Sequence, residues 1–221
     1  GDTILLKSGS IWNGEWLWPK GSGTADAPIK IDKYGGDALP VINGMGIDRG
    51  MNYSGAVHLR NQEYWEIRNL EVTNDDDFDV DIDLSRPQGD NSWSSQAETR
   101  NGILIIADGD LLNDGDDGIF NHIYIENCYV HDVDGPNDWN DTFTGGIIYN
   151  VVGTKIRPNT SFRDIRIAYN TIRKVDLLGI TGFVQMAKSG YQDDVDTYNL
   201  WMEDIYIGHN YIEDVAQGGI D

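Results

Sequence analysis

The residues best able to do chemistry recur at fixed positions within a repeated segment. Three copies, beginning at Ile123, Ile165 and Ile205, align without gaps, and a weaker copy begins at Trp65. Eight, nine and eleven residues after each start, the aligned positions are mostly polar or charged. They form three columns: Thr73, His131, Arg173 and Glu213; Asn74, Asp132, Lys174 and Asp214; and Asp76, Asp134, Asp176 and Ala216. Columns so rich in carboxylates are typical of acid–base chemistry.

The spacing of the columns predicts pairs of carboxylates. If successive copies stack about 4.8 Å apart, as neighbouring strands do, Asp134 and Asp176 lie one step apart, near the separation of about 5 Å in a retaining glycosidase. Asp132 and Asp214 lie two steps apart, near the upper limit of about 9.5 Å for an inverting glycosidase. Two acids this close also separate their pKa values, so that one stays protonated. The candidate catalytic residues are therefore Asp134, Asp176, Asp132, Asp214, Glu213 and His131.

A structural role is the competing interpretation, because aspartates in solvated turns often cap backbone amides. The clustering of the carboxylates beside a turn of variable length favours a site. Trp139 lies in that turn between Asp138 and Asn140, where an indole can stack on a sugar ring or anchor the loop. The candidate substrate-binding residues are Trp139, Arg173, Lys174 and Trp93.

Acidic runs raise the question of a metal ion. Six aspartates lie between Asp75 and Asp83, and a second acidic, glycine-rich run spans 108–117. Calcium prefers six to eight oxygen ligands at flexible spacing. We expect a calcium site that uses Asp75, Asp76, Asp77 and Asp79, and the alternative is a charged loop that keeps a sheet edge soluble. No cluster of histidine and cysteine in the sequence indicates zinc.

The elements that position these residues are predicted to be strands. Apolar residues at the start of each copy and two residues later alternate as in a β-strand, and every copy later returns to a Gly-Ile pair: Gly102-Ile103, Gly146-Ile147, Gly179-Ile180 and Gly219-Ile220. Repeats of about 40 residues with turns of variable length are typical of a parallel β-solenoid. A β-sandwich is the alternative, but it would show separate hairpins rather than copies of one motif.

Side chains at the bend of each copy support the solenoid. Asn170 and Asn210 are expected to point inward, where a stacked amide can satisfy backbone groups of successive bends. Cys128 occupies the same position, so a role as a catalytic thiol is not expected. Trp12, Trp16 and Trp18 alternate in the opening strand, where we expect them to cover one end of the fold.

Composition excludes several classes of partner. The chain has 221 residues, 39% of them hydrophobic, and a net charge of −21, which disfavours nucleic acid and anionic membranes. No segment approaches the roughly 20 apolar residues of a membrane span. A single cysteine forbids an intramolecular disulfide.

The sequence resembles a known group of proteins. The segments GDTILLKSGS (1–10), GSGTADAPIKI (21–31) and PVING (40–44) resemble the opening coils of secreted bacterial right-handed parallel β-helix proteins, with PbH1-type repeats, that degrade polysaccharides. YWEIRNLEV (64–72), HIYI (122–125) and TGGI (144–147) continue the likeness. The resemblance implies an all-β, right-handed parallel β-helix of about six coils in one domain, residues 1–221, secreted from a bacterium. We expect its coils to continue beyond residue 221, so that the rest of a longer chain is a partner.

Three functions remain open. The first is a glycoside hydrolase that acts on a plant or algal polysaccharide through an Asp/Glu pair. The second is a calcium-assisted polysaccharide lyase, in which Lys174 or Arg173 abstracts the proton next to a uronate carboxyl group. The third is a carbohydrate-binding solenoid without catalysis. The excess of acidic over basic residues in the three columns favours hydrolysis.

Overall fold

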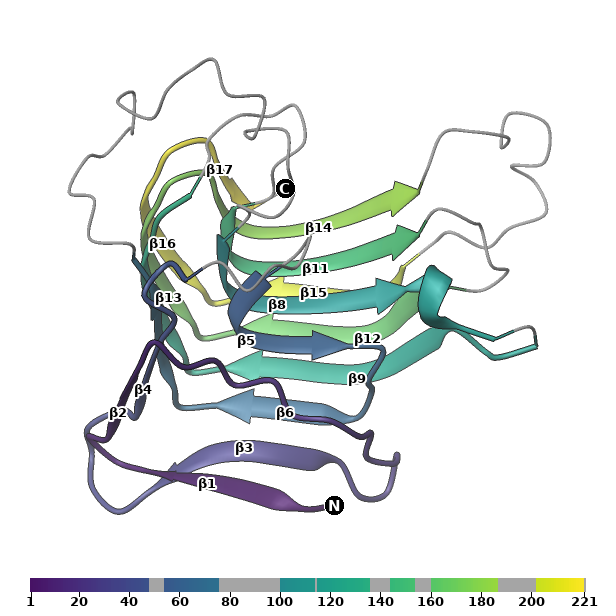
Figure 1. The fold of residues 1–221 in the computed structure, drawn as a ribbon, viewed down its shortest axis with the longest axis horizontal. Helices are drawn as coiled ribbons and strands as arrows, with labels where there is room; N and C mark the ends of the chain where they lie inside the picture. The colour runs from purple at the N-terminus through teal and green to yellow at the C-terminus, as the bar shows by residue number, and fades with distance from the viewer. Residues whose placement is uncertain are drawn as a thin grey trace.

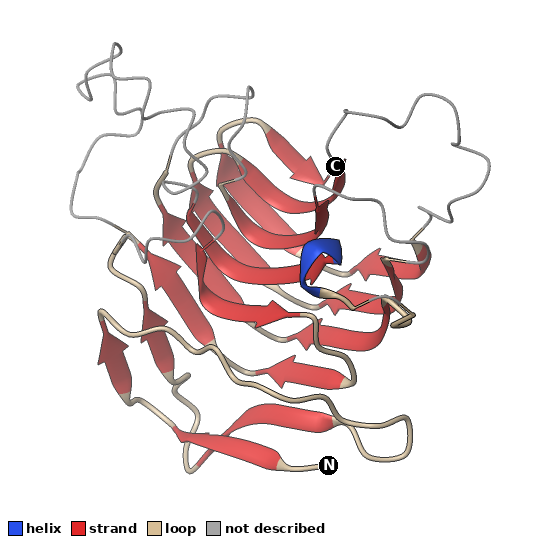
Figure 2. Cartoon of the chain, turned by 45° about the vertical axis from the view of Figure 1, so that its right-hand side comes forward, coloured by secondary structure: helices blue, strands red, loops and turns tan. Residues whose placement is uncertain are grey.

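The chain of the computed structural model winds upward through three parallel sheets, with the N-terminus at the bottom and the C-terminal strands at the top (Figure 1). The structure describes residues 1–47, 54–75, 100–113, 115–135, 144–153, 160–186 and 202–220. A short 3₁₀ helix, η3 (Gly109–Leu111), follows the third-sheet strand β8 (Figure 2). Among the described residues, no helix has the length and apolar character needed to cross a membrane.

Each coil contributes one strand to each sheet, and we call one level of the stack a rung. The first sheet contains β1 (Thr3–Lys7), β3 (Ile29–Tyr34), β6 (Trp65–Arg68), β9 (Ile119–Glu126), β12 (Ser161–Ala168) and β15 (Glu203–Gly208). The second contains β2 (Ile11–Asn13), β4 (Val41–Asn43), β7 (Glu71–Asn74), β10 (Tyr129–Val133), β13 (Thr171–Val175) and β16 (Tyr211–Val215). The third contains β5 (Ser54–Arg60), β8 (Arg100–Asp108), β11 (Gly145–Gly153), β14 (Leu178–Met186) and β17 (Gly218–Ile220).

The register of the strands confirms the alignment of the three strong copies. Ile165 pairs with Ile123 in the rung below and with Ile205 in the rung above. The isoleucines of the Gly-Ile pairs stack in the third sheet: Ile103, Ile147, Ile180 and Ile220. In the described part of the chain, the first two sheets hold six strands each and the third holds five. The predicted parallel β-helix of about six coils is therefore confirmed.

An inward ladder of isoleucines forms the centre of the core. Equivalent positions on the strands of the first sheet hold Ile4, Ile31, Ile67, Ile125, Ile167 and Ile207. The four in the middle of this ladder are fully buried. β-branched side chains fit a pleated surface, and each buried isoleucine contributes roughly 1.5–3 kcal/mol. The two-residue alternation in the sequence thus gives one continuous core.

An asparagine ladder stabilises the bend between the first and second sheets, as the sequence predicted. Asn170 Oδ1 accepts a hydrogen bond from Cys128 N at 2.9 Å, and Asn170 Nδ2 donates to Ile125 O at 2.9 Å. One rung higher, Asn210 Oδ1 accepts from Asn170 N at 2.9 Å, and Asn210 Nδ2 donates to Ile167 O at 2.9 Å. Each amide therefore satisfies two backbone groups in the rung below.

Cys128 occupies the same inward position one rung below Asn170. Its side chain is 2% exposed, and burial raises the pKa of its thiol to about 12. A thiol with this pKa stays protonated at neutral pH and is a poor nucleophile. The expectation that Cys128 is a core residue is confirmed.

Glycines are required where the third sheet leaves the bend from the second. A Cβ atom on Gly102 would lie 2.4 Å from Val130 Cγ1, and a Cβ atom on Gly146 would lie 2.8 Å from Ile172 Cγ2. Only glycine permits this close approach of the third sheet to the core residues of the second. This explains why each copy returns to a Gly-Ile pair.

The alignment of the weaker fourth copy is wrong by one residue. Thr73 pairs with His131 as predicted, but the register then shifts and Asn74 pairs with Val133 instead of Asp132. Asp132 is an extra residue with a φ of +47°, and the next two rungs carry similar residues with φ of +50° and +57° at the same position. β7 lacks this bulge, so Asn74 takes the buried position that valine holds in the rung above.

The prediction that Trp16 and Trp18 lie in the opening strand is also wrong, because β2 ends at Asn13. Leu17 instead pairs beside β5, where Leu17 N donates to Ala56 O at 2.7 Å and His58 N donates to Leu17 O at 2.9 Å. The indole of Trp18 stacks on the imidazole of His58 with ring centroids 4.9 Å apart. Trp18 therefore does cover an end of the helix, at the first rung of the third sheet.

Burial of His58 predicts acid sensitivity. Desolvation, together with the charges of Arg60 and Lys20, lowers the pKa of His58 to about 3. An unfolded histidine titrates near 6.5, so between about pH 6.5 and 3 the unfolded chain binds a proton that the folded chain does not. The free energy of unfolding should fall with pH in this window, by about 1.4 kcal/mol per pH unit from this residue.

His58→Phe keeps a ring under Trp18 and removes the titration. We expect urea unfolding at pH 7.5 and pH 5 to show a drop in stability that is smaller in the variant by about 2 kcal/mol. Because neither ring nitrogen of His58 has a hydrogen-bond partner, phenylalanine breaks no hydrogen bond. The same pH dependence in both proteins would contradict this assignment.

Candidate functional site

The turn between the second and third sheets stacks carboxylates in a column. Asp134 N donates to Asn74 O at 3.3 Å, and Asp176 N donates to Val133 O at 3.1 Å. In a parallel ladder this pattern places Asp134 opposite Asp75 in the rung below and opposite Asp176 in the rung above. Asp75, Asp134 and Asp176 therefore occupy three consecutive rungs, about 4.8 Å apart. We call these three residues the aspartate column.

The alignment had placed Asp76 at the lowest position of this column, and the missing bulge in β7 explains the difference. Asp75 was predicted only as a metal ligand. Strand alternation could have located it, because Val72 and Asn74 are both buried and Asp75 is the first residue after them. The structure therefore brings together Asp134 and Asp176 as predicted and adds Asp75.

The upper member of the column is fixed by a backbone contact. Asp176 Oδ2 accepts a hydrogen bond from Gly135 N at 3.0 Å, across to the residue that follows Asp134. Both aspartates are half-buried. A carboxylate that accepts a backbone N–H is stabilised as an anion and is held in one orientation. The column thus contains one oriented carboxylate next to a second carboxylate one rung below.

The other candidate catalytic residues lie away from this turn, on the second sheet. The imidazole of His131 contacts Asp132 Oδ2 through Nδ1 and lies 3.2 Å from Glu71 Oε1 through Nε2. Asp132 and Asp214 lie two rungs apart, as the register of Val133, Val175 and Val215 requires. Asp214 is exposed. These side chains do not join the aspartate column.

The two predicted substrate-binding cations are ion-paired on the same sheet. Lys174 Nζ lies 3.4 Å from Asp132 Oδ1. Arg173 Nε contacts Glu213 Oε1, and the Tyr211 hydroxyl donates to Glu213 Oε2. Glu213 therefore serves as a partner for these two groups. The remaining candidates, Trp139, Trp93, Asp76, Asp77 and Asp79, lie outside the described residues.

Polar side chains of the first sheet form a separate network. His122 Nδ1 lies 3.1 Å from Asp164 Oδ2, the Tyr124 hydroxyl donates to Asp164 Oδ1 at 3.0 Å, and Lys30 Nζ lies 3.1 Å from Glu66 Oε2. Burial alone would raise the pKa of Glu66, but the hydrogen bond from Lys30 and the charge of Arg68 lower it. These groups pair with one another across rungs. Within the described residues, no group of three or more His, Cys, Asp or Glu side chains could hold a metal ion.

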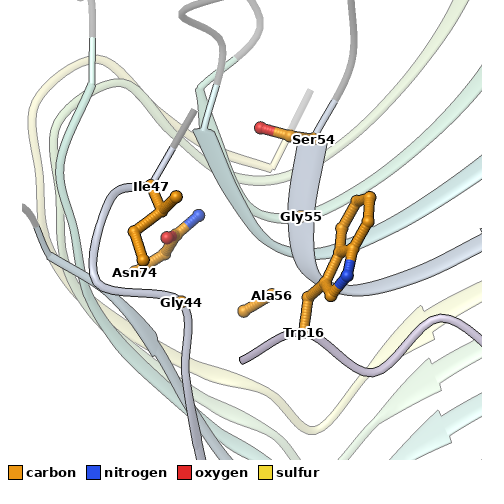
Figure 3. Close-up of a pocket in the computed structure, with 7 residues that line it drawn as sticks. All are labelled: Trp16, Gly44, Ile47, Ser54, Gly55, Ala56 and Asn74. Carbon is orange, nitrogen blue, oxygen red and sulfur yellow. The ribbon is translucent and has the colours of Figure 1, made fainter. Parts of the chain in front are cut away.

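A pocket of about 190 Å³ lies at the lower end of the aspartate column (Figure 3). The indole of Trp16 stands on one side of the pocket, and Ile47 and Asn74 stand on the other. Asn74 directly precedes Asp75, which places the pocket and the column on one continuous edge of the β-helix. The described lining residues are Trp16, Gly44, Ile47, Ser54, Gly55, Ala56 and Asn74.

The fold and the site define a parallel β-helix protein with carboxylates stacked along one turn. No family model matches the chain. A lacto-N-biosidase of Bifidobacterium longum subsp. longum is 29% identical to the chain over 238 residues, which cover 87% of this chain and 14% of that protein. The chain thus spans a small part of this curated relative.

Solved structures of a related enzyme have the same fold. The selenomethionine derivative of a GH136 lacto-N-biosidase from Eubacterium ramulus matches all of this chain and 37% of that chain, with a TM-score of 0.75 and 24% identity. The native protein matches with a TM-score of 0.71 and 22% identity, over 96% of this chain and 35% of that chain. At this identity, the likeness establishes the β-helix fold.

Proposed function

We propose that the chain carries glycoside hydrolase activity and that the aspartate column is its catalytic site. The observation that carries the proposal is the register that places Asp134 and Asp176 on adjacent rungs. A spacing of about 4.8 Å is close to the separation of about 5 Å that retaining glycosidases use. The relative from Bifidobacterium longum, which bears the name of a glycosidase, supports the same reaction class.

The two carboxyl groups would take different roles. Asp176, which accepts a hydrogen bond from Gly135 N, suits the anionic nucleophile that attacks the anomeric carbon. Asp134 would donate a proton to the leaving glycosidic oxygen and later remove one from the water that hydrolyses the glycosyl–enzyme intermediate. Asp75, on the other side of Asp134, is the alternative nucleophile.

The lyase hypothesis is less well supported. Its candidate bases, Lys174 and Arg173, are held in ion pairs with Asp132 and Glu213 on the second sheet. A base for proton abstraction must be within reach of the substrate and able to lose its own proton. An ion pair favours the charged form of both side chains.

A neutral glycan is the proposed substrate. The name of the relatives denotes glycosidases for lacto-N-biosides, so an oligosaccharide with a terminal lacto-N-biose unit is favoured over the plant or algal polysaccharide expected from the sequence. The test is a panel of 4-nitrophenyl lacto-N-bioside, xylan, pectate and alginate. Release of 4-nitrophenol or reducing ends indicates hydrolysis, and absorbance of unsaturated products indicates a lyase. Glycan binding without any product would favour the non-catalytic solenoid.

We also propose that the acidic run that begins at Asp75 binds calcium. Six carboxylates within nine residues repel one another, and a divalent ion would relieve this repulsion. A ligand that binds only the folded state stabilises it. We expect the melting temperature to rise with added CaCl₂ and to fall with EDTA, whereas added MgCl₂ should have a smaller effect. A melting curve that calcium and EDTA leave unchanged would assign the run to solubility alone.

A further inference from the structure

We infer that the Trp16 pocket binds one neutral sugar unit of the substrate, adjacent to the unit that is cleaved at the aspartate column. This inference rests on the proposed function for the position of the bond. The pocket itself is defined by its seven lining residues, which come from three separate parts of the chain: the segment after β2, the turn between β4 and β5, and the end of β7.

The pocket is kept open by the backbone and by a fixed amide. A Cβ atom on Gly44 would lie 2.3 Å from Asn74 Oδ1 and 3.3 Å from Ala56 Cβ, so only glycine fits there. Asn74 Oδ1 accepts from Gly46 N at 3.0 Å, and Asn74 Nδ2 donates to Asn101 O at 3.0 Å. A primary amide has two N–H groups and two lone pairs, so Asn74 keeps one of each to offer a ligand.

The chemistry of the walls suits a sugar without charge. The described lining contains an indole, the apolar side chains of Ile47 and Ala56, a hydroxyl and an amide, and none of these residues is ionisable. Sugar rings combine an apolar face with hydroxyl groups, which an aromatic wall and a fixed amide can both recognise. A uronate would find no cation in this lining, inside a protein with a net charge of −21. The pocket therefore favours a hexose or an N-acetylhexosamine.

The position of the pocket gives its role. Asn74 precedes Asp75 and pairs through its carbonyl with Asp134 N, one rung above. The pocket thus lies about 4.8 Å below Asp134 along the helix axis and about twice that below Asp176. This step is comparable to the length of one sugar unit, so a chain that fills the pocket presents its next glycosidic bond to the column.

The experiment measures binding without turnover. In the Asp134→Asn background, lacto-N-biose and digalacturonate are titrated calorimetrically into the parent and into Trp16→Ala, Trp16→Phe, Ile47→Trp and Tyr206→Ala variants. We expect the parent to bind lacto-N-biose more tightly than digalacturonate. Trp16→Ala should weaken lacto-N-biose binding about tenfold, and Trp16→Phe should restore part of it. Ile47→Trp fills the pocket from a residue that is 43% exposed and should also weaken binding.

Tyr206 is the matched control, because it is 42% exposed but lies on the first sheet. Its alanine variant should bind like the parent. Equal affinities of the parent, Trp16→Ala and Ile47→Trp would overturn the inference, as would tighter binding of digalacturonate or no binding of either sugar. If Trp16→Ala fails to fold, Ile47→Trp and Trp16→Phe decide the result. Trp16-dependent binding by a protein that hydrolyses no glycan would refute the proposed function and leave the pocket assignment intact.

Discussion

Asp134→Asn is expected to lower kcat by about 10²- to 10⁴-fold while the protein stays folded. Asp134 is the middle residue of the aspartate column, so both adjacent carboxylate pairs include it. Asparagine keeps the shape of the side chain but cannot transfer a proton. Asp176→Asn should cause a loss of similar size if Asp176 is the nucleophile, and Asp75→Asn should then have the smaller effect. The reverse order would identify Asp75 as the nucleophile.

The measurement is the rate of hydrolysis of the best substrate in the panel, together with a melting curve for each variant. Asp204→Asn is the matched control: Asp204 is exposed on β15 of the first sheet and has a φ of +57°, which asparagine also adopts readily. Its activity should equal that of the wild type. Full activity in both Asp134→Asn and Asp176→Asn would refute the proposed site, and azide rescue of one variant would identify the nucleophile.

Residues with short-range periodicity were predictable from the sequence. The inward positions of Ile123, Ile165 and Ile205 follow from strand alternation, and an asparagine repeated at one bend indicates a ladder of amides. The structure bears out both predictions because each depends only on contacts between adjacent rungs. In a solenoid such contacts repeat, so a sequence repeat directly gives the register.

The rest depends on local backbone geometry that the residue types alone do not specify. A bulge in β10 that β7 lacks shifted the alignment by one residue and placed Asp76, instead of Asp75, in the column. Trp16 was assigned to a strand because it alternates with Trp18, but the chain leaves β2 at Gly14 and pairs Leu17 with Val57 in the third sheet. The pocket depends on that crossing, so no spacing within the sequence could reveal it.

The asparagine ladder predicts the largest loss of stability from a single substitution. Asn170→Leu should lower the free energy of unfolding by about 2–5 kcal/mol, because Cys128 N and Ile125 O would be left buried without a partner. Leucine is the informative replacement, since Leu70 fills the equivalent inward position two rungs below and is fully buried. The substitution therefore tests the hydrogen bonds with little change in packing.

Urea unfolding followed by circular dichroism measures this effect as a shift of the midpoint at constant slope. Asn127→Gly provides the control: Asn127 lies in the same bend and is exposed, with a φ of +56° that glycine adopts without strain. Its stability should change by less than about 0.5 kcal/mol. If Asn170→Leu unfolds at the same urea concentration as the wild type, the bend is held by packing alone. The amides would then serve to fix the register of the rungs, and the variant should show strands that pair out of step although its stability is unchanged.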